Sequence, residues 1–261
     1  MHRVIIPVDF SENSLKAARY AAQMLAGKKD ATAILYNNYE TEDEQGICIN
    51  YLESLKKEFL NTGVNSVVLE HEMGGELVDN ITRLVQSSRA TLVVMGISGK
   101  SVIEQVMFGS NTLKLVDENL YPVLIIPPNA VYNGISHVAF ASDFMDIEAT
   151  TPSVLISAVL EMFNPMLHIV NINSEHYVSL TEEIQQGKEK FRELFSAYKI
   201  EFYFITRNDF LEALDNFVTD YKIDILITIP KHQSNSRTLF KTSRTKELAY
   251  HSRIPILAAH E

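Results

Sequence analysis

Short apolar runs alternate along the chain with longer stretches in which apolar residues recur every three or four positions. In the first half, the short runs predict five buried strands, at Val4–Asp9, Ala31–Asn37, Ser66–Glu70, Thr91–Met95 and Val123–Ile126. The helical spacing between them predicts four helices, at Ser11–Gly27, Leu52–Phe59, Leu77–Val85 and Leu113–Leu120. In the first of these helices, Ser11 is a favourable N-cap residue and Gly27 is a favourable residue for the C-terminal end.

The second half has the same order of elements. Its predicted strands are Val138–Ser142, Met166–Ile172, Ile200–Ile205, Ile223–Ile229 and Ile254–Ala258. Its predicted helices are Ala149–Met162, Thr181–Tyr198, Phe210–Tyr221 and Ser243–His251. Alternating strands and helices predict an α/β fold with mostly parallel sheets, each flanked by helices in a doubly wound arrangement. Ligands of such folds bind beyond the carboxyl ends of the strands, where the strand order reverses.

Two blocks of sequence repeat at nearly one offset. VIIPVDF, which contains Asp9, matches VAFASDF, which contains Asp143 134 residues later. GSNTLKLVDENLYPVLIIP at 109–127 matches TSRTKELAYHSRIPILAAH at 242–260, an offset of 133. The alternative is coincidence between generic strand and helix patterns. Two blocks at one offset favour two homologous units of five strands each, residues 1–130 and 135–261, joined by a Pro- and Asn-containing linker.

Composition narrows the class of protein. The chain has 261 residues, a net charge of −10 and 46% hydrophobic residues, as expected of globular domains. The acidic balance argues against a nucleic-acid surface, and the longest apolar runs are strand-sized, which argues against a membrane span. A single cysteine, Cys48, excludes an internal disulfide. Together with an N-terminus that predicts a strand rather than a signal peptide, it favours the cytoplasm.

The strongest candidate site follows the fourth predicted strand. Gly96-Ile97-Ser98-Gly99 is followed by nine residues and then by Gly109-Ser110, where a helix begins. Glycines let a backbone approach phosphates closely, and a helix N-terminus attracts anions. Lys100 and Lys114 would add positive charge. Taken alone, the glycines are equally explained by turn geometry.

The glycine spacing G-x2-G-x9-G-[S/T] resembles the nucleotide-binding pattern of the universal stress protein family. VIIPVDFSENS with the alanine-rich helix after it, ATLVVMGISG, and GSNTLKLVDENLYPVLIIP are also similar to segments of that family. The resemblance covers both halves, so the chain is identified as a tandem member with two Rossmann-like domains.

The resemblance implies an adenine-nucleotide site in the first half. Asp9 at the end of the first strand would contact the adenosine, and Asn38 or its neighbour Asn37 would contact adenine. The full implied set is Pro7, Val8, Asp9, Asn38, Met95, Gly96, Gly99, Gly109, Ser110 and Asn111. For Asp9, the competing interpretation is a carboxylate that caps the following helix, and the two roles are compatible.

The second half departs from this pattern. The three glycine positions hold Ile229, His232 and Thr242, and only Ser243 remains. Side chains at these positions would stand where a phosphate binds, which predicts a degenerate site without nucleotide. Asp143 is then structural. The basic loop around Lys231 and Arg237 is either a solvated surface or a site for an anion or a partner.

Three functions follow as hypotheses. The first is a stress-response or regulatory protein that binds ATP, or alternatively ADP or AMP, with Mg²⁺ as a candidate companion. For this hypothesis we assign no catalytic or metal-ligating residue, and slow hydrolysis of ATP stays open. The second is a scaffold that binds no nucleotide and docks an unknown protein partner. The third is a nucleotidyl transferase, which the scattered histidines disfavour. The closing strands of the two halves are expected to pair as an intramolecular pseudo-dimer, with a homodimer as the alternative.

Overall fold

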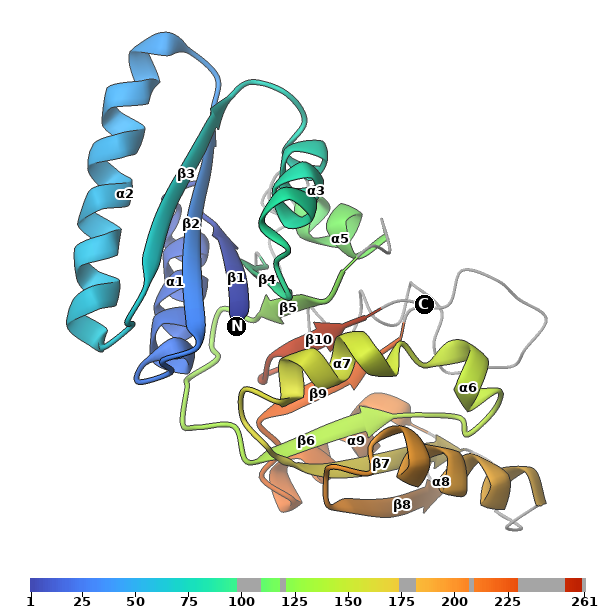
Figure 1. Cartoon of the computed structure of the whole chain (residues 1–261). Coiled ribbons are helices and arrows are strands. Elements are labelled where there is room, and N and C mark those ends of the chain that lie inside the picture. Colours follow the sequence, from blue (N-terminus) through green and yellow to red (C-terminus); the bar gives the residue numbers. More distant parts are fainter. Residues whose placement is uncertain (98–108, 118–120, 174–181, 207–208, 230–251, 260–261) are drawn as a thin grey trace. The chain divides into compact units, whose positions relative to one another are not determined.

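The computed structural model describes residues 1–97, 109–117, 121–173, 182–206, 209–229 and 252–259 (Figure 1). The chain divides into two compact units, Met1–Tyr132 and Asn133–Glu261. In each unit a sheet of five strands is flanked by helices, and all strand pairings given within the described parts of the units are parallel. The α/β class expected from the sequence is confirmed.

Unit one has the strand order β3-β2-β1-β4-β5. Its strands are β1 (His2–Pro7), β2 (Ala31–Tyr39), β3 (Val67–Met73), β4 (Leu92–Gly96) and β5 (Val123–Ile126). Its described helices are α1 (Glu12–Leu25), α2 (Glu42–Thr62), α3 (Leu77–Ser88) and α5 (Gly109–Asp117). Helices α1 and α2 cover one face of the sheet, and α3 and α5 cover the other (Figure 1). This two-sided cover explains why Val4, Ile5 and Ile6 of the central strand are fully buried.

Unit two repeats this order as β8-β7-β6-β9-β10. Its strands are β6 (His137–Ala141), β7 (Met166–Asn173), β8 (Ile200–Thr206), β9 (Ile225–Thr228) and β10 (Ile256–Ala258). Its described helices are α6 (Ile147–Thr150), α7 (Ser153–Leu160), α8 (Glu182–Leu194) and α9 (Phe210–Asp220). The helix predicted at Ser243–His251 lies outside the described residues.

The prediction of one continuous helix over Ala149–Met162 is wrong. The segment forms α6 and α7, separated at Thr151 and Pro152. Proline lacks the backbone N–H of a helix interior, and it disfavours helical angles at the residue before it. Thr151 accordingly has extended angles, φ −109° and ψ 110°. The matching helix of unit one, α1, is unbroken over 14 residues.

The two units share hydrogen bonds at matching positions. The side-chain amide of Asn37 donates to the Val8 carbonyl at 2.7 Å, and that of Asn171 donates to the Ser142 carbonyl at 2.9 Å. Both pairs are related by the offset of the sequence repeat, 134 residues. Phe10 and Phe144, related in the same way, have unusual positive φ angles of 62° and 63°. The repeat is therefore present in backbone geometry as well as in sequence.

Candidate functional site

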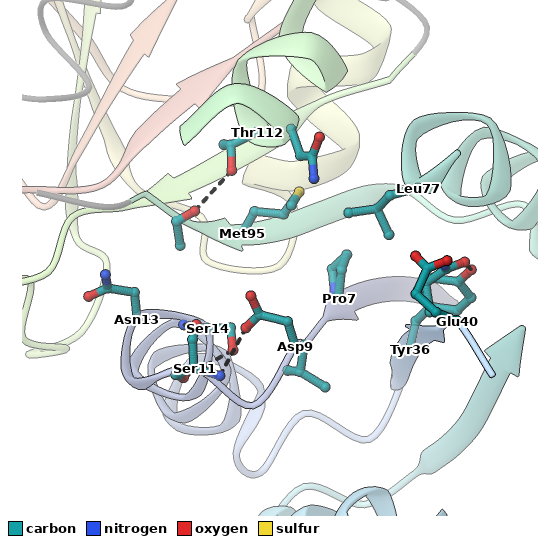
Figure 2. A pocket seen from close by; sticks show the side chains of 14 residues that line it. Pro7, Asp9, Ser11, Asn13, Ser14, Tyr36, Glu40, Leu77, Met95 and Thr112 are labelled. Atoms are coloured by element: carbon teal, nitrogen blue, oxygen red, sulfur yellow. Dashed lines mark hydrogen bonds between the residues drawn. The ribbon is translucent and has the colours of Figure 1, made fainter. Parts of the chain in front are cut away.

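A cavity of about 280 Å³ lies in unit one at the carboxyl ends of the central strands (Figure 2). Strand β1 pairs with β2 on one side and with β4 on the other, so the strand order reverses here. The cavity is lined by Pro7, Val8, Asp9, Ser11, Asn13, Ser14, Tyr36, Asn38, Glu40, Leu77, Met95, Gly96, Asn111 and Thr112. Its volume is near the lower end of the roughly 300–1,000 Å³ of small-molecule sites.

Most of the site residues expected from the sequence meet at this cavity. Those that line it are Pro7, Val8, Asp9, Asn38, Met95, Gly96 and Asn111. Gly109 and Ser110 are the first two residues of α5. Gly99 and Lys100 lie outside the described residues. Asn37 is buried and bonded to the Val8 carbonyl, so Asn38 is the member of the asparagine pair that faces the cavity.

Asp9 stands at the entrance to helix α1. Its Oδ1 accepts a hydrogen bond from the backbone N–H of Ser11 at 2.9 Å. Ser11 is the N-cap, and its hydroxyl accepts from the backbone N–H of Ser14 at 3.3 Å. Figure 2 shows these three side chains together at the cavity wall. Ser11, and not Asp9, therefore caps the helix; Asp9 bonds the backbone of the cap residue, and its exposed carboxylate also lines the cavity.

Gly96 is required by the close approach of α1 to β4. A Cβ atom at this position would stand 2.7 Å from the backbone oxygen of Asn13, nearer than real Cβ contacts come. The carbonyl of Gly96 accepts a hydrogen bond from the Thr112 hydroxyl at 2.9 Å, which ties β4 to α5. The glycine therefore brings the N-terminal turn of α1 and the end of β4 to the same cavity.

Strand β2 supplies a polar wall that the sequence motifs did not reveal. Tyr36, Asn38 and Glu40 are alternate residues, so they share one face of the chain, and all three line the cavity. The Tyr36 hydroxyl donates to Asn38 Oδ1 at 3.2 Å. Burial raises the pKa of Tyr36 to about 12, so the phenol stays protonated at neutral pH and remains a donor. The alternation of side chains along β2 is the sequence signal that could have placed Tyr36 and Glu40 on the same face as Asn38.

At the corresponding position in unit two, the described residues form only a small hollow. The hollow there has a volume of about 10 Å³ and is lined by Phe140, Ala141, Ser142, Asp143, Ile147, Thr150, Thr151 and Ile229. That is about the space of one water molecule. Ile229, which stands at the position of the first glycine, lines this hollow. Thr150 and Thr151, at the break between α6 and α7, line it as well. His232, Thr242 and the basic loop lie outside the described residues.

Among the described residues, no three His, Cys, Asp or Glu side chains gather in a way that would hold a metal ion. No helix within the described ranges is long and apolar enough to span a membrane.

Comparison with known protein families gives a match that covers most of unit one. Residues 1–127 match the model of the universal stress protein family. A universal stress protein of Archaeoglobus fulgidus DSM 4304 superposes with a TM-score of 0.68 at 16% identity, over 99% of this chain and 96% of that one. A functionally unknown protein of Pseudomonas aeruginosa PAO1 has a TM-score of 0.64 at 13% identity, over 99% and 92% of the two chains.

A curated relative comes from Schizosaccharomyces pombe. This uncharacterized protein is 28% identical over 137 residues, which are 46% of this chain and 22% of the relative. The chain thus matches about a fifth of the length of that relative. The structural similarities extend over both units and show a shared fold. Residues 1–127 thus match the universal stress protein family, and the structural similarity to a solved universal stress protein covers both units.

Proposed function

We propose that unit one binds an adenine nucleotide, ATP, in the cavity at the switch point, and that the chain acts as a stress-response or regulatory protein. The observation that carries the proposal is the contrast between equivalent positions of the two units. The cavity has about 280 Å³ in unit one and about 10 Å³ in unit two. ADP and AMP are the alternative ligands, and Mg²⁺ is the expected companion of a triphosphate.

The lining residues supply suitable chemistry for a nucleoside. The Asp9 carboxylate is an acceptor for ribose hydroxyls, and Val8 and Met95 are apolar surface for a base. We place the phosphates toward Gly96 and the start of α5 at Gly109 and Ser110. The first backbone N–H groups of a helix have no intrahelical acceptor, and the helix dipole favours an anion there.

We assign binding rather than turnover to this site. Among the described residues, the carboxylates that line it are Asp9, whose Oδ1 is engaged at the entry of α1, and Glu40 on the strand β2 side. Neither forms part of a metal-binding cluster within the described residues. Hydrolysis, if present, is expected to be slow. The single cysteine, Cys48, is free, which accords with our placement of the protein in the reducing cytoplasm.

Asp9→Ala is expected to weaken ATP binding about ten- to a hundredfold, because a hydrogen bond to a charged group contributes roughly 1.5–3 kcal/mol. Asp143→Ala is the matched control. Asp143 Oδ1 accepts from the Met145 N–H at 3.0 Å, as Asp9 accepts from Ser11 at 2.9 Å. Calorimetric titration of the full chain measures both affinities.

The two variants remove equivalent helix-entry bonds, so a general loss of stability would affect both. Equal ATP affinity of the two variants would contradict the proposed site. No binding by the unmodified chain would favour instead the scaffold hypothesis, in which a protein partner is the ligand. Pairing of the two closing strands as a pseudo-dimer, or of two chains as a homodimer, stays a prediction of the sequence.

A further inference from the structure

A chain of hydrogen bonds behind the cavity wall begins at Arg83 of α3. One nitrogen of its guanidinium, Nη2, donates to Glu72 Oε1 and to Asn80 Oδ1, each at 2.7 Å. Arginine has donors only, so the atom of Asn80 that faces it must be the amide oxygen. The Nδ2 group of Asn80 must therefore point the other way. It donates to the Gly74 carbonyl at 2.9 Å and to Asn38 Oδ1 at 2.5 Å.

This series of hydrogen bonds fixes the orientation of Asn38 at the cavity. Its Oδ1 accepts from Asn80 and from the Tyr36 hydroxyl. The Nδ2 amide, a donor, is then the group of Asn38 that remains for a ligand. Asn80 is only 1% exposed, and a Cβ at Gly75 would stand 2.9 Å from its Oδ1, so its side chain has little room to rearrange.

Glu40 places an acceptor on the same wall. It follows Asn38 by two residues, and both side chains line the cavity. Figure 2 shows Glu40 on the Tyr36 side of the cavity. An N–H donor beside a carboxylate matches the Watson–Crick edge of adenine, which has an acceptor at N1 and an amino donor at N6. Guanine reverses both groups, with N1–H as a donor and O6 as an acceptor.

We infer that Asn38 and Glu40 select adenine over guanine, and that Arg83, acting through Asn80, is the positioning residue that holds Asn38 in the selecting orientation. The inference rests on the proposed nucleotide site. Arg83 is not among the lining residues, so its effect on base preference is transmitted through Asn80 and Asn38.

Arg83→Met tests the positioning role, and the readout is the ratio of ATP to GTP affinity in the full chain. The unmodified protein is expected to prefer ATP at least about tenfold, as a matched pair of base contacts does elsewhere. Without Arg83 the amide oxygen of Asn80 loses its donor, and of the two partners Arg83 and Gly74 only the Gly74 carbonyl still orients the amide, so the preference is expected to fall to within about threefold. Arg83→Lys keeps a donor-only side chain and is expected to retain the preference.

Arg19→Met is the matched control. Arg19 bonds Glu58 at 2.6 Å with a side chain 55% exposed, and Arg83 bonds Glu72 at 2.7 Å with a side chain 59% exposed. Loss of a surface ion pair alone would lower both nucleotide affinities together and leave their ratio unchanged. The thermal unfolding midpoint of Arg83→Met, measured alongside, is expected to be the lower of the two, because this variant also removes the donor to the buried Oδ1 of Asn80.

Glu40→Gln provides a second test that does not depend on the hydrogen bonds from Arg83 through Asn80 to Asn38. The amide both donates and accepts, so it tolerates guanine O6, and the ATP preference is expected to fall. If the unmodified chain binds ATP and GTP equally, or if Arg83→Met keeps the preference, the inference is wrong while the nucleotide site stands. If the chain binds neither nucleotide, the proposed function and the inference both fail.

Discussion

Gly96→Ala is expected to destabilise unit one by about 2–3 kcal/mol and to abolish ATP binding at concentrations that saturate the unmodified chain. The added methyl group would stand 2.7 Å from the backbone oxygen of Asn13 and 3.4 Å from the Cβ of Ala17. Overpacking of this kind costs about 1–3 kcal/mol, and a backbone oxygen has less freedom to move than a side chain. Because Asn13 and Gly96 both line the cavity, moving α1 away from β4 distorts the site itself.

Gly46→Ala is the control for this substitution. Gly46 lies in α2, and a Cβ there would meet no atom within 4 Å. Alanine at that position is expected to stabilise the helix by about 0.5–1 kcal/mol. Urea unfolding of the full chain measures both changes, and hydrogen exchange assigns them to unit one. A neutral effect of Gly96→Ala would show that the approach of α1 to β4 is looser than described.

Phe144→Ala is expected to destabilise unit two by about 3–5 kcal/mol, in the range of buried phenylalanine truncations. Phe144 is 2% exposed, and its ring lies 5.2 Å from that of Phe204 and 5.6 Å from that of Phe191. A Cβ at Gly187 would also stand 2.6 Å from the Phe144 carbonyl oxygen, so α8 approaches this residue closely. Phe144 thus belongs to a packed aromatic core in unit two.

Phe10→Ala is the matched control in unit one. Phe10 is half-buried and contacts the ring of Tyr51 at 4.9 Å, and its φ of 62° equals that of Phe144 within one degree. Any strain of alanine at positive φ therefore cancels in the comparison. The expected cost of Phe10→Ala is about 1 kcal/mol. Equal losses in the urea unfolding of the two variants would contradict the tighter packing described for Phe144.

Much of the fold could be predicted from the sequence because burial leaves a periodic signal. The apolar run Val4–Ile6 is fully buried in the structure, as a central parallel strand requires. The match between Asp9 and Asp143 also has a structural counterpart, since both accept a backbone N–H two residues later. Apolar spacing alone does not predict the helix break at Pro152, because it continues across the break, although the missing N–H of proline is a local signal.

The remaining parts of the site depend on contacts between distant segments. The glycine spacing drew attention to Gly96 as a phosphate contact, whereas the structure shows that it admits the backbone of Asn13, 83 residues earlier in the chain. The orientation of Asn38 is set by Asn80 and Arg83 of α3, and no local pattern in β2 reports on that helix. Single-sequence patterns identify which residues reach a cavity better than they identify what holds those residues in place.

The most direct test of nucleotide binding by unit one alone is the stoichiometry of ATP binding. The purified, nucleotide-stripped full chain would be titrated calorimetrically with ATP and Mg²⁺. The cavity of about 280 Å³ in unit one and the hollow of about 10 Å³ in unit two predict one site per chain. Two sites would show that unit two opens to bind a second nucleotide, and the absence of binding would contradict the proposed function.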